Sequence, residues 1–190
     1  MKLIVIDGID GAGKDTVAEI VTHSLRLQGY SVSVRNHPSP STVGVLTLNA
    51  LRKRGAFARV FASVLFLFEL LISSWRLRRE TSDYVVFVRF IVGSAYVPLN
   101  AHQLIYAILR SILPKGDMML FVDAEPEIAL RRIKERRNGW EMFENLESLK
   151  LVRERAFALL GTDWAVIKNN WSLSELRIGI DPHLEEFTEK

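Results

Sequence analysis

A glycine-rich segment near the start of the chain has the residue types and spacing of a phosphate-binding loop. It reads Gly8-Ile9-Asp10-Gly11-Ala12-Gly13-Lys14-Asp15-Thr16 and directly follows an apolar, strand-like run. Its glycines allow successive backbone amides to turn inward around phosphate oxygens. The helix that follows points its free N–H groups and its positive dipole end at the same anion. Because Lys14 can also reach the β- and γ-phosphates, we predict that residues 8–16 bind a nucleoside triphosphate such as ATP.

One residue of this loop departs from the usual pattern. The position after the lysine is normally Ser or Thr, whose hydroxyl holds Mg²⁺, and here it is Asp15. Mg²⁺ readily accepts a carboxylate oxygen as a ligand, often through water. An acidic residue in the first turn of a helix is also favourable without any metal. Asp15 is therefore a candidate metal ligand, with helix stabilisation as the alternative.

Apolar, β-rich runs alternate with longer segments of helical periodicity along the rest of the chain. The predicted strands are 2–7, 31–35, 84–89, 118–123 and 164–168. The predicted helices are 14–28, 43–53, 57–79, 100–113, 126–136, 146–160 and 172–187. This alternation indicates an α/β fold, in which a parallel sheet is covered on both faces and ligands bind at the carboxyl ends of its strands. The 190 residues fit one domain.

Composition narrows the possible chemistry. The chain has no cysteine, which excludes disulfides, thiolate catalysis and Cys-based zinc sites and fits a cytoplasmic protein. The net charge of +3 is mildly basic, but the basic residues form no long stripe, so we expect no stable nucleic-acid partner. Their dense cluster at 131–137 is either a solvated helix face or a site for an anionic substrate.

The segment 57–75 is apolar on nearly every side of its predicted helix. Arg59 and Glu69 interrupt it, so its longest apolar run is shorter than a bilayer requires. A buried helix is therefore favoured over a membrane span. One domain covers only one face of such a helix, so we expect a second subunit to cover the other.

Three further segments carry a recognisable pattern. They are 113–133, the stretch Trp140-Glu141-Met142-Phe143-Glu144 with the helix after it, and Val88-Arg89-Phe90 followed by Ser94-Ala95-Tyr96. Together with the phosphate loop, and in the same order along nearly the whole chain, they resemble the thymidylate kinase family of P-loop nucleotide kinases. The resemblance implies a three-layer α/β/α P-loop NTPase fold with a five-stranded parallel sheet, a lid at about 132–145, and usually a homodimer. It implies transfer of the ATP γ-phosphate to dTMP, with Mg²⁺, to give dTDP for dTTP synthesis.

The resemblance also assigns roles to single residues, each with a plainer alternative. Lys14 matches the phosphate-loop lysine. Arg89 matches an arginine that binds the acceptor phosphate, and its alternative is a surface arginine at a strand end. Asp10 matches a carboxylate near the acceptor's sugar and phosphate, or stabilises a turn. Phe66 matches an aromatic residue that stacks on the acceptor base, and Tyr96 a ring near the same base. Core packing explains either ring equally simply.

Other candidates surround the expected ATP site. Arg132, Arg136 and Arg137 fall around the predicted lid, where a cation could close over the transferring phosphate, and Arg136 ranks first. Helix solvation is the alternative for each. Asp123 ends an apolar strand, either as a carboxylate near the metal or as a cap for the helix that begins near Pro126. The pair Asn169-Asn170 either holds adenine or forms a loop.

The chain departs from the family at three further positions, one near the metal and two on the acceptor side. Val88 stands where the family has an aspartate before Arg89. Leu70 stands where it has an arginine one helical turn after Phe66, and Met142 where it has an arginine before Phe143. Asp15 could supply part of the metal shell lost at Val88. The losses leave two alternatives to a dTMP kinase: another small-molecule or nucleotide kinase on the same scaffold, and a nucleotide-binding protein with weak kinase activity.

Overall fold

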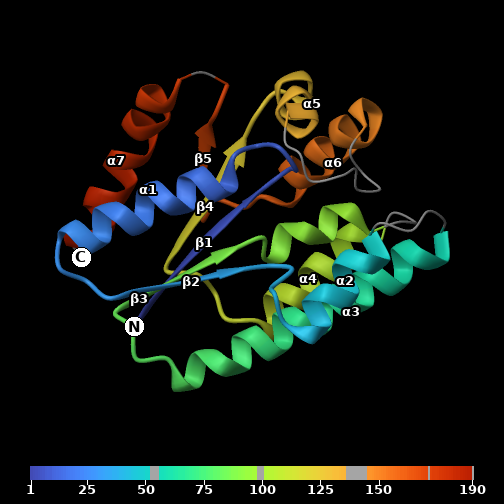
Figure 1. The fold of residues 1–190 in the computed structure, drawn as a ribbon, viewed down its shortest axis with the longest axis horizontal. Helices are drawn as coiled ribbons and strands as arrows, with labels where there is room; N and C mark the ends of the chain where they lie inside the picture. Colours follow the sequence, from blue (N-terminus) through green and yellow to red (C-terminus); the bar gives the residue numbers. More distant parts are fainter. Residues whose placement is uncertain (52–55, 98–100, 136–144, 171, 190) are drawn as a thin grey trace.

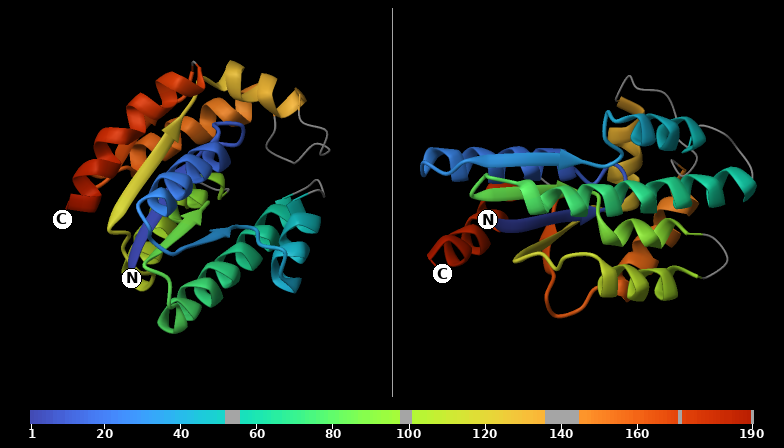
Figure 2. Two further views of the ribbon diagram at one scale, coloured as in Figure 1. Left: turned by 60° about the vertical axis from the view of Figure 1, so that its left-hand side comes forward. Right: turned by 90° about the horizontal axis from the view of Figure 1, so that it is seen from below.

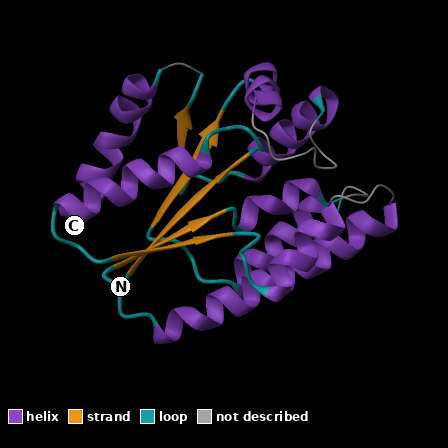
Figure 3. Ribbon diagram, in the orientation of Figure 1, coloured by secondary structure: helices purple, strands orange, loops and turns teal. Residues whose placement is uncertain are grey.

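Five parallel strands form one twisted sheet at the centre of the molecule (Figure 3). A computed structural model of the chain describes residues 1–51, 56–97, 101–135, 145–170 and 172–189. The strands are β1 (Lys2–Gly8), β2 (Val32–Asn36), β3 (Tyr84–Val88), β4 (Met118–Asp123) and β5 (Ala165–Lys168). Their order is β2-β3-β1-β4-β5, and every neighbouring pair is parallel. The predicted five-stranded parallel sheet is confirmed.

The three central strands lie in the hydrophobic core. All residues of β3 and β4 are buried, and so are the five interior residues of β1. Strands that are buried on both faces read as continuous apolar runs, which is why these three strands could be located from the sequence. Because β1 lies between β3 and β4, the loop that follows it emerges at the middle of the sheet's carboxyl edge.

Helices cover both faces of the sheet (Figures 1 and 2). They are α1 (Lys14–Leu27), α2 (Thr42–Leu51), α3 (Ala56–Arg76), α4 (His102–Ile112), α5 (Pro126–Glu135), α6 (Leu146–Leu159) and α7 (Leu173–Glu189), with 3₁₀ helices η1 (Leu77–Arg79) and η2 (Ile91–Tyr96). Helix α1 packs against β1 and α7, whereas η2 packs against α4 and α6. The result is the predicted α/β/α layering.

Helix α3 carries apolar residues on both its inner and its outer face and packs along α2 (Figure 1). Its inner face buries Ala62, Glu69 and Leu70. Its outer face exposes a stripe at helical spacing: Phe61, Val64, Phe68, Leu71 and Trp75. No helix in the described part of the chain is long and apolar enough to cross a membrane. The described face of α3 is thus uncovered, which is the arrangement expected if a second subunit covers it.

The end of β3 differs from the prediction in a way that shapes the site. The predicted strand includes Arg89, but β3 ends at Val88, and Arg89 has a φ of 61°. The carboxylate of Asp7 accepts hydrogen bonds from the backbone N–H groups of Phe90 and Val92, at 2.9 and 3.0 Å. These bonds draw the chain out of the sheet and into η2, a short helix that the sequence pattern does not predict.

Candidate active site

The phosphate loop joins β1 to α1 and has the backbone that its glycines require. Gly11 and Gly13 have φ values of 76° and 94°, in the left-handed region that favours glycine. A Cβ at Gly11 would lie 2.4 Å from the Ala129 carbonyl oxygen, and one at Gly13 would lie 2.3 Å from Asn169 Nδ2. Neither position can accept a side chain without displacing its neighbour. The loop thus lies closely against α5 and against Asn169, which follows β5.

Lys14 begins α1 and is held against the loop. Its side chain is 2% exposed, and its ammonium group donates to the Ile9 carbonyl oxygen at 2.6 Å. The same Nζ lies 3.8 Å from Asp10 Oδ1. Burial, followed by the nearby charge of Arg89, lowers the pKa of Lys14 from 10.5 to about 8. A buried cation at the mouth of a phosphate loop is costly to hold and suits an anionic ligand.

Arg89 lies across from this lysine, where β3 ends. Its backbone N–H donates to the Ile6 carbonyl oxygen at 3.1 Å, which fixes the start of the side chain beside β1. Its guanidinium lies between two carboxylates: Nε is 3.9 Å from Asp10 Oδ1 and Nη1 is 3.5 Å from Asp15 Oδ1. A non-glycine residue with positive φ is uncommon and often marks a functional position. The structure thus brings together the predicted residues Asp10, Lys14, Asp15 and Arg89.

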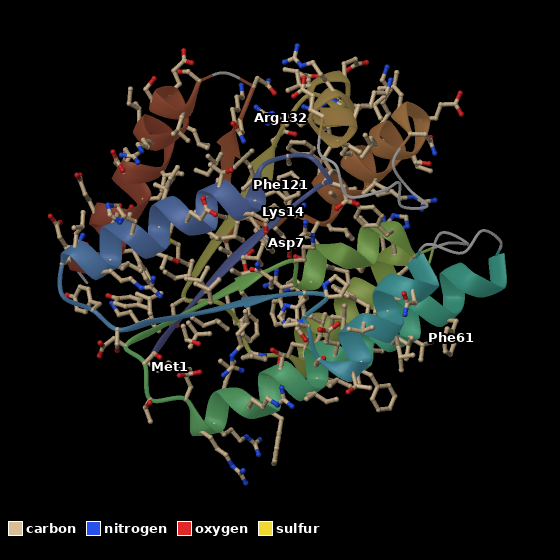
Figure 4. All side chains as sticks on the ribbon, viewed as in Figure 1. Met1, Asp7, Lys14, Phe61, Phe121 and Arg132 are labelled. Carbon is tan, nitrogen blue, oxygen red and sulfur yellow. The ribbon has the colours of Figure 1, made fainter. Side chains whose placement is uncertain are left out.

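Asp7 is a functional residue that the sequence reasoning missed. It is 2% exposed at the end of β1, and burial raises the pKa of its carboxyl group in spite of two backbone hydrogen bonds. Figure 4 shows Asp7 and Lys14 close together where β1 meets α1. Asp7 fixes the backbone that carries Arg89, so it is a positioning residue. A carboxylate at the end of a continuous apolar run was the signal that could have identified it.

Tyr96 and Phe66, the two rings predicted to lie near the acceptor base, both lie at η2. The Tyr96 hydroxyl accepts a hydrogen bond of 2.9 Å from the Asp10 backbone N–H. Burial raises the pKa of Tyr96 well above 10, so this phenol stays neutral. Phe66 packs against η2, where a Cβ on Gly93 would come within 2.8 Å of its ring. Tyr96 therefore positions the loop, and Phe66 projects from α3 toward the same short helix.

Arg132 and Asn169 complete the loop's opposite side. Asn169 Nδ2 donates to the Ala12 carbonyl oxygen at 2.7 Å, and Arg132 Nη2 lies 3.5 Å from Asn169 Oδ1. The Arg132 Nη1 atom is buried without a hydrogen-bond partner in the described part of the chain. Arg136, the first-ranked candidate for the lid cation, and Arg137 lie outside the described residues. Of the predicted lid 132–145, only 132–135 and Asn145 are described.

Two other predicted residues have structural partners. The Asp123 carboxylate accepts two hydrogen bonds from Arg153, at 2.7 and 2.9 Å, which ties β4 to α6. Asn170 Oδ1 accepts from the Glu125 backbone N–H at 2.8 Å. In the described part of the chain the Asp123 carboxylate is thus paired with Arg153, and its roles as a helix cap or as a carboxylate near the metal stay predictions. Its pairing depends on an arginine thirty positions away, which no local pattern predicts.

Two of the positions predicted to depart from the family pattern, Val88 and Leu70, are both 0% exposed. Val88 lies in the centre of the sheet's carboxyl edge, and Leu70 packs in the core below α3. The third departure, Met142, lies outside the described residues. Val88 and Leu70 are thus part of the hydrophobic core.

The carboxylates near the loop permit a simple test of whether the site fits Mg²⁺. The described residues contain no group of three His, Cys, Asp or Glu side chains that could hold a metal ion. Asp15 is the exposed carboxylate at the first turn of α1, with its side chain 58% accessible. This donor set fits an ion carried mainly by nucleotide phosphates and water, which is how Mg²⁺ commonly binds in kinases.

Comparison with known proteins agrees with this geometry. The family model described as thymidylate kinase matches residues 6–178. A probable thymidylate kinase of Archaeoglobus fulgidus is 29% identical over 97% of this chain and 95% of its own length. A thymidylate kinase of Xanthomonas oryzae pv. oryzae is 30% identical over 80% of this chain and 68% of its own.

A solved structure of the thymidylate kinase of Candida albicans has the same fold. It superposes with a TM-score of 0.73 at 20% identity and covers 98% of this chain and 92% of its own. The order of strands, the phosphate loop and the arginine at the end of β3 are thus found together with a family match over most of the sequence. The chain belongs to the thymidylate kinase family, whose members are ATP-dependent phosphotransferases.

Proposed function

We infer that this protein transfers the γ-phosphoryl group of ATP to dTMP and forms dTDP and ADP. The family match supports this reaction. The observation that carries it is the placement of Lys14 and Arg89 within 4 Å of the same Asp10 carboxylate oxygen, at the carboxyl ends of β1 and β3. One cation faces the phosphate loop, and the other faces the space where an acceptor phosphate would arrive.

Phosphoryl transfer requires the protein to align the two phosphates and to neutralise their charge. An oxygen of the acceptor phosphate attacks the γ-phosphorus, and the bond from that phosphorus to the β–γ bridging oxygen breaks. Because the attacking oxygen is already anionic, no general base is needed. Catalysis then rests on holding the two phosphates in line and stabilising the charge that spreads over the transferring group.

Each residue of the site has a place in this scheme. The amides of 8–16 and the ammonium group of Lys14 hold the ATP phosphates. The guanidinium of Arg89 binds the acceptor phosphate, for which its fork of donors is well shaped. Phe66 stacks on the acceptor base, while Tyr96 holds the backbone of Asp10 so that its carboxylate faces the acceptor.

We propose that Mg²⁺ enters with the nucleotide and that Asp15 is its protein ligand, directly or through water. The cation would neutralise part of the charge on the phosphates. A Mg²⁺ titration of Asp15→Asn tests this role. A raised Mg²⁺ requirement supports it, whereas an unchanged requirement contradicts it.

We also propose that Arg132 acts beside the phosphate loop, together with Arg136 from the lid. Arg132 has a buried guanidinium nitrogen without a described partner, close to Gly13 and Asn169. A cation in this place would interact favourably with the nucleotide.

The activity is tested by a coupled assay of ADP formation over a panel of nucleoside monophosphates. We expect dTMP to be the preferred acceptor, and we expect Arg89→Ala to raise the KM for the acceptor more than the KM for ATP. Arg35→Ala is a matched control, since Arg35 pairs with Glu80 away from the loop. If another monophosphate replaced dTMP, a different kinase on this scaffold would be indicated. ATP binding without transfer to any acceptor would indicate a nucleotide-binding protein.

We propose a homodimer in which the outer stripe of α3 is covered by a second copy. Phe61, on the outer side of α3 in Figure 4, and Phe68 are 48% and 58% exposed. A contiguous exposed apolar stripe of this kind is typical of an interface between proteins. Phe68→Glu should convert the protein to a monomer in sedimentation analysis, and a monomeric wild-type protein would contradict the proposal. The cytoplasmic location also stays a prediction, which fractionation of expressing cells would check.

A further inference from the structure

The carboxylate of Asp15 contacts the arginine that should bind the acceptor. Asp15 Oδ1 lies 3.5 Å from Arg89 Nη1, while Asp10 Oδ1 lies 3.9 Å from Nε of the same guanidinium. Both carboxylates come from the phosphate loop and the first turn of α1. The guanidinium is therefore engaged on two of its edges by carboxylates of the same chain.

The backbone of Arg89 cannot move away to free the side chain. Its N–H donates to the Ile6 carbonyl oxygen, and the next residue, Phe90, donates to the buried carboxylate of Asp7. These bonds come from β1, in the centre of the sheet. When a ligand binds the guanidinium, the Arg89 side chain must therefore rotate away from the two carboxylates while its backbone stays in place.

A hydroxyl at position 15, as in the usual loop pattern, would leave Arg89 without this competing charge. Asp15 is also the more exposed of the two carboxylates, with 58% of its side chain accessible against 17% for Asp10. The ion pair of Arg89 with the more exposed carboxylate is the easier one to break, because water can replace the guanidinium at that carboxylate.

We propose that Asp15 is an intramolecular competitor of the acceptor phosphate. In the nucleotide-free protein it holds the guanidinium of Arg89, and it releases the guanidinium when the acceptor phosphate binds. The phosphate forms a bidentate, doubly charged contact, which is stronger than the contact with a single carboxylate. Asp15 is thus a residue that sets acceptor affinity and favours dianionic phosphates. This inference rests on the proposed function only for the identity of the acceptor.

The test measures acceptor binding without ATP and without any divalent cation, so that a metal-ligand role of Asp15 has no influence. Calorimetry gives the Kd of dTMP, and in parallel of inorganic phosphate, for the wild type, Asp15→Asn and Asp15→Ser. We expect both variants to bind more tightly, by about three- to fivefold, as befits the loss of one exposed ion pair. Glu19→Gln is the matched control, because Glu19 is an exposed acid one turn further along α1 with no described partner.

A double-mutant cycle identifies Arg89 as the group for which Asp15 competes. In an Arg89→Lys background the gain from Asp15→Asn should shrink, because the bidentate donor is gone. The proposal is overturned if neither probe binds more tightly to Asp15→Asn. An equal gain in Glu19→Gln, or a full gain in the Arg89→Lys background, overturns it as well. If only inorganic phosphate binds, and its gain is lost in the Arg89→Lys background, the proposal stands and the assignment of dTMP as acceptor fails.

Discussion

Replacing Lys14 by methionine should stabilise the nucleotide-free protein while it removes activity. Lys14 is 2% exposed, and its pKa falls from 10.5 to about 8 on folding, mainly through burial. A shift of this size corresponds to about 3 kcal/mol of unfavourable free energy for the charged form. Methionine fills a similar volume without charge. The variant also loses the hydrogen bond from Lys14 to the Ile9 carbonyl oxygen, and this loss destabilises it by about 1 kcal/mol.

The pH dependence of this effect follows from the direction of the shift. Below pH 8 both the folded and the unfolded states of the wild type carry the proton on Lys14, so the full cost of the buried charge is present. Between pH 8 and 10.5 the unfolded state binds more protons than the folded state, so wild-type stability rises with pH. Lys14→Met should therefore be about 2 kcal/mol more stable at pH 7 and about equal in stability at pH 9.5.

Urea denaturation of both proteins at the two pH values measures this difference. Lys134→Met is the control, because Lys134 is exposed on α5 and should show no such pH-dependent gap. The kinase activity of Lys14→Met should fall by about a hundredfold or more, as for the loss of a preorganised charge. A variant that is less stable than the wild type at pH 7, or a stability difference that does not change with pH, would refute the reasoning.

Three further predictions concern neighbouring parts of the site. Gly93→Ala places a methyl group 2.8 Å from the ring of Phe66, so the ring must turn. The KM for dTMP should then rise at least about fivefold, whereas the Kd of ATP should not change. Arg132→Ala removes the cation beside the phosphate loop and should weaken ATP binding about tenfold in a direct titration. Arg153→Ala leaves the carboxylate of Asp123, whose side chain is 6% exposed, without its partner, and should lower the free energy of unfolding by about 2–3 kcal/mol with little change in the KM for ATP.

Matched variants separate these effects from general ones. Arg131→Ala removes an exposed cation from the same helix as Arg132 and should leave ATP binding unchanged. Lys150→Ala breaks an exposed ion pair with Glu127 and should leave the free energy of unfolding nearly unchanged. Equal effects of Arg131→Ala on ATP, or of Lys150→Ala on stability, would show that the specific contacts are not responsible.

The parts of the structure that depend on neighbours in sequence could be predicted. The strands β1, β3 and β4 are continuous apolar runs because the sheet is covered on both faces, and they lie within two residues of the predicted bounds. The phosphate loop is one contiguous segment whose glycines must adopt special φ values, so its residue types reveal its shape.

The parts that depend on distant contacts could not be predicted. The helix η2 forms because Asp7 accepts hydrogen bonds from residues more than eighty positions away. Likewise, the partner of Arg89 at Asp15 comes from the first turn of α1, and the partner of Asp123 comes from α6. Sequence patterns identified Arg89, Asp15 and Asp123 as candidates but missed Asp7, and only the packing of the elements determines which of these charged groups meet.

Transfer of a labelled γ-phosphate from ATP tests the central claim most directly. The purified protein is incubated with γ-labelled ATP, Mg²⁺ and dTMP, and the products are separated by chromatography. We predict that the label appears in dTDP and that Arg89→Ala, with its acceptor-side guanidinium removed, greatly slows its appearance. Label that appears only as inorganic phosphate, or on a different monophosphate in preference to dTMP, would contradict the account.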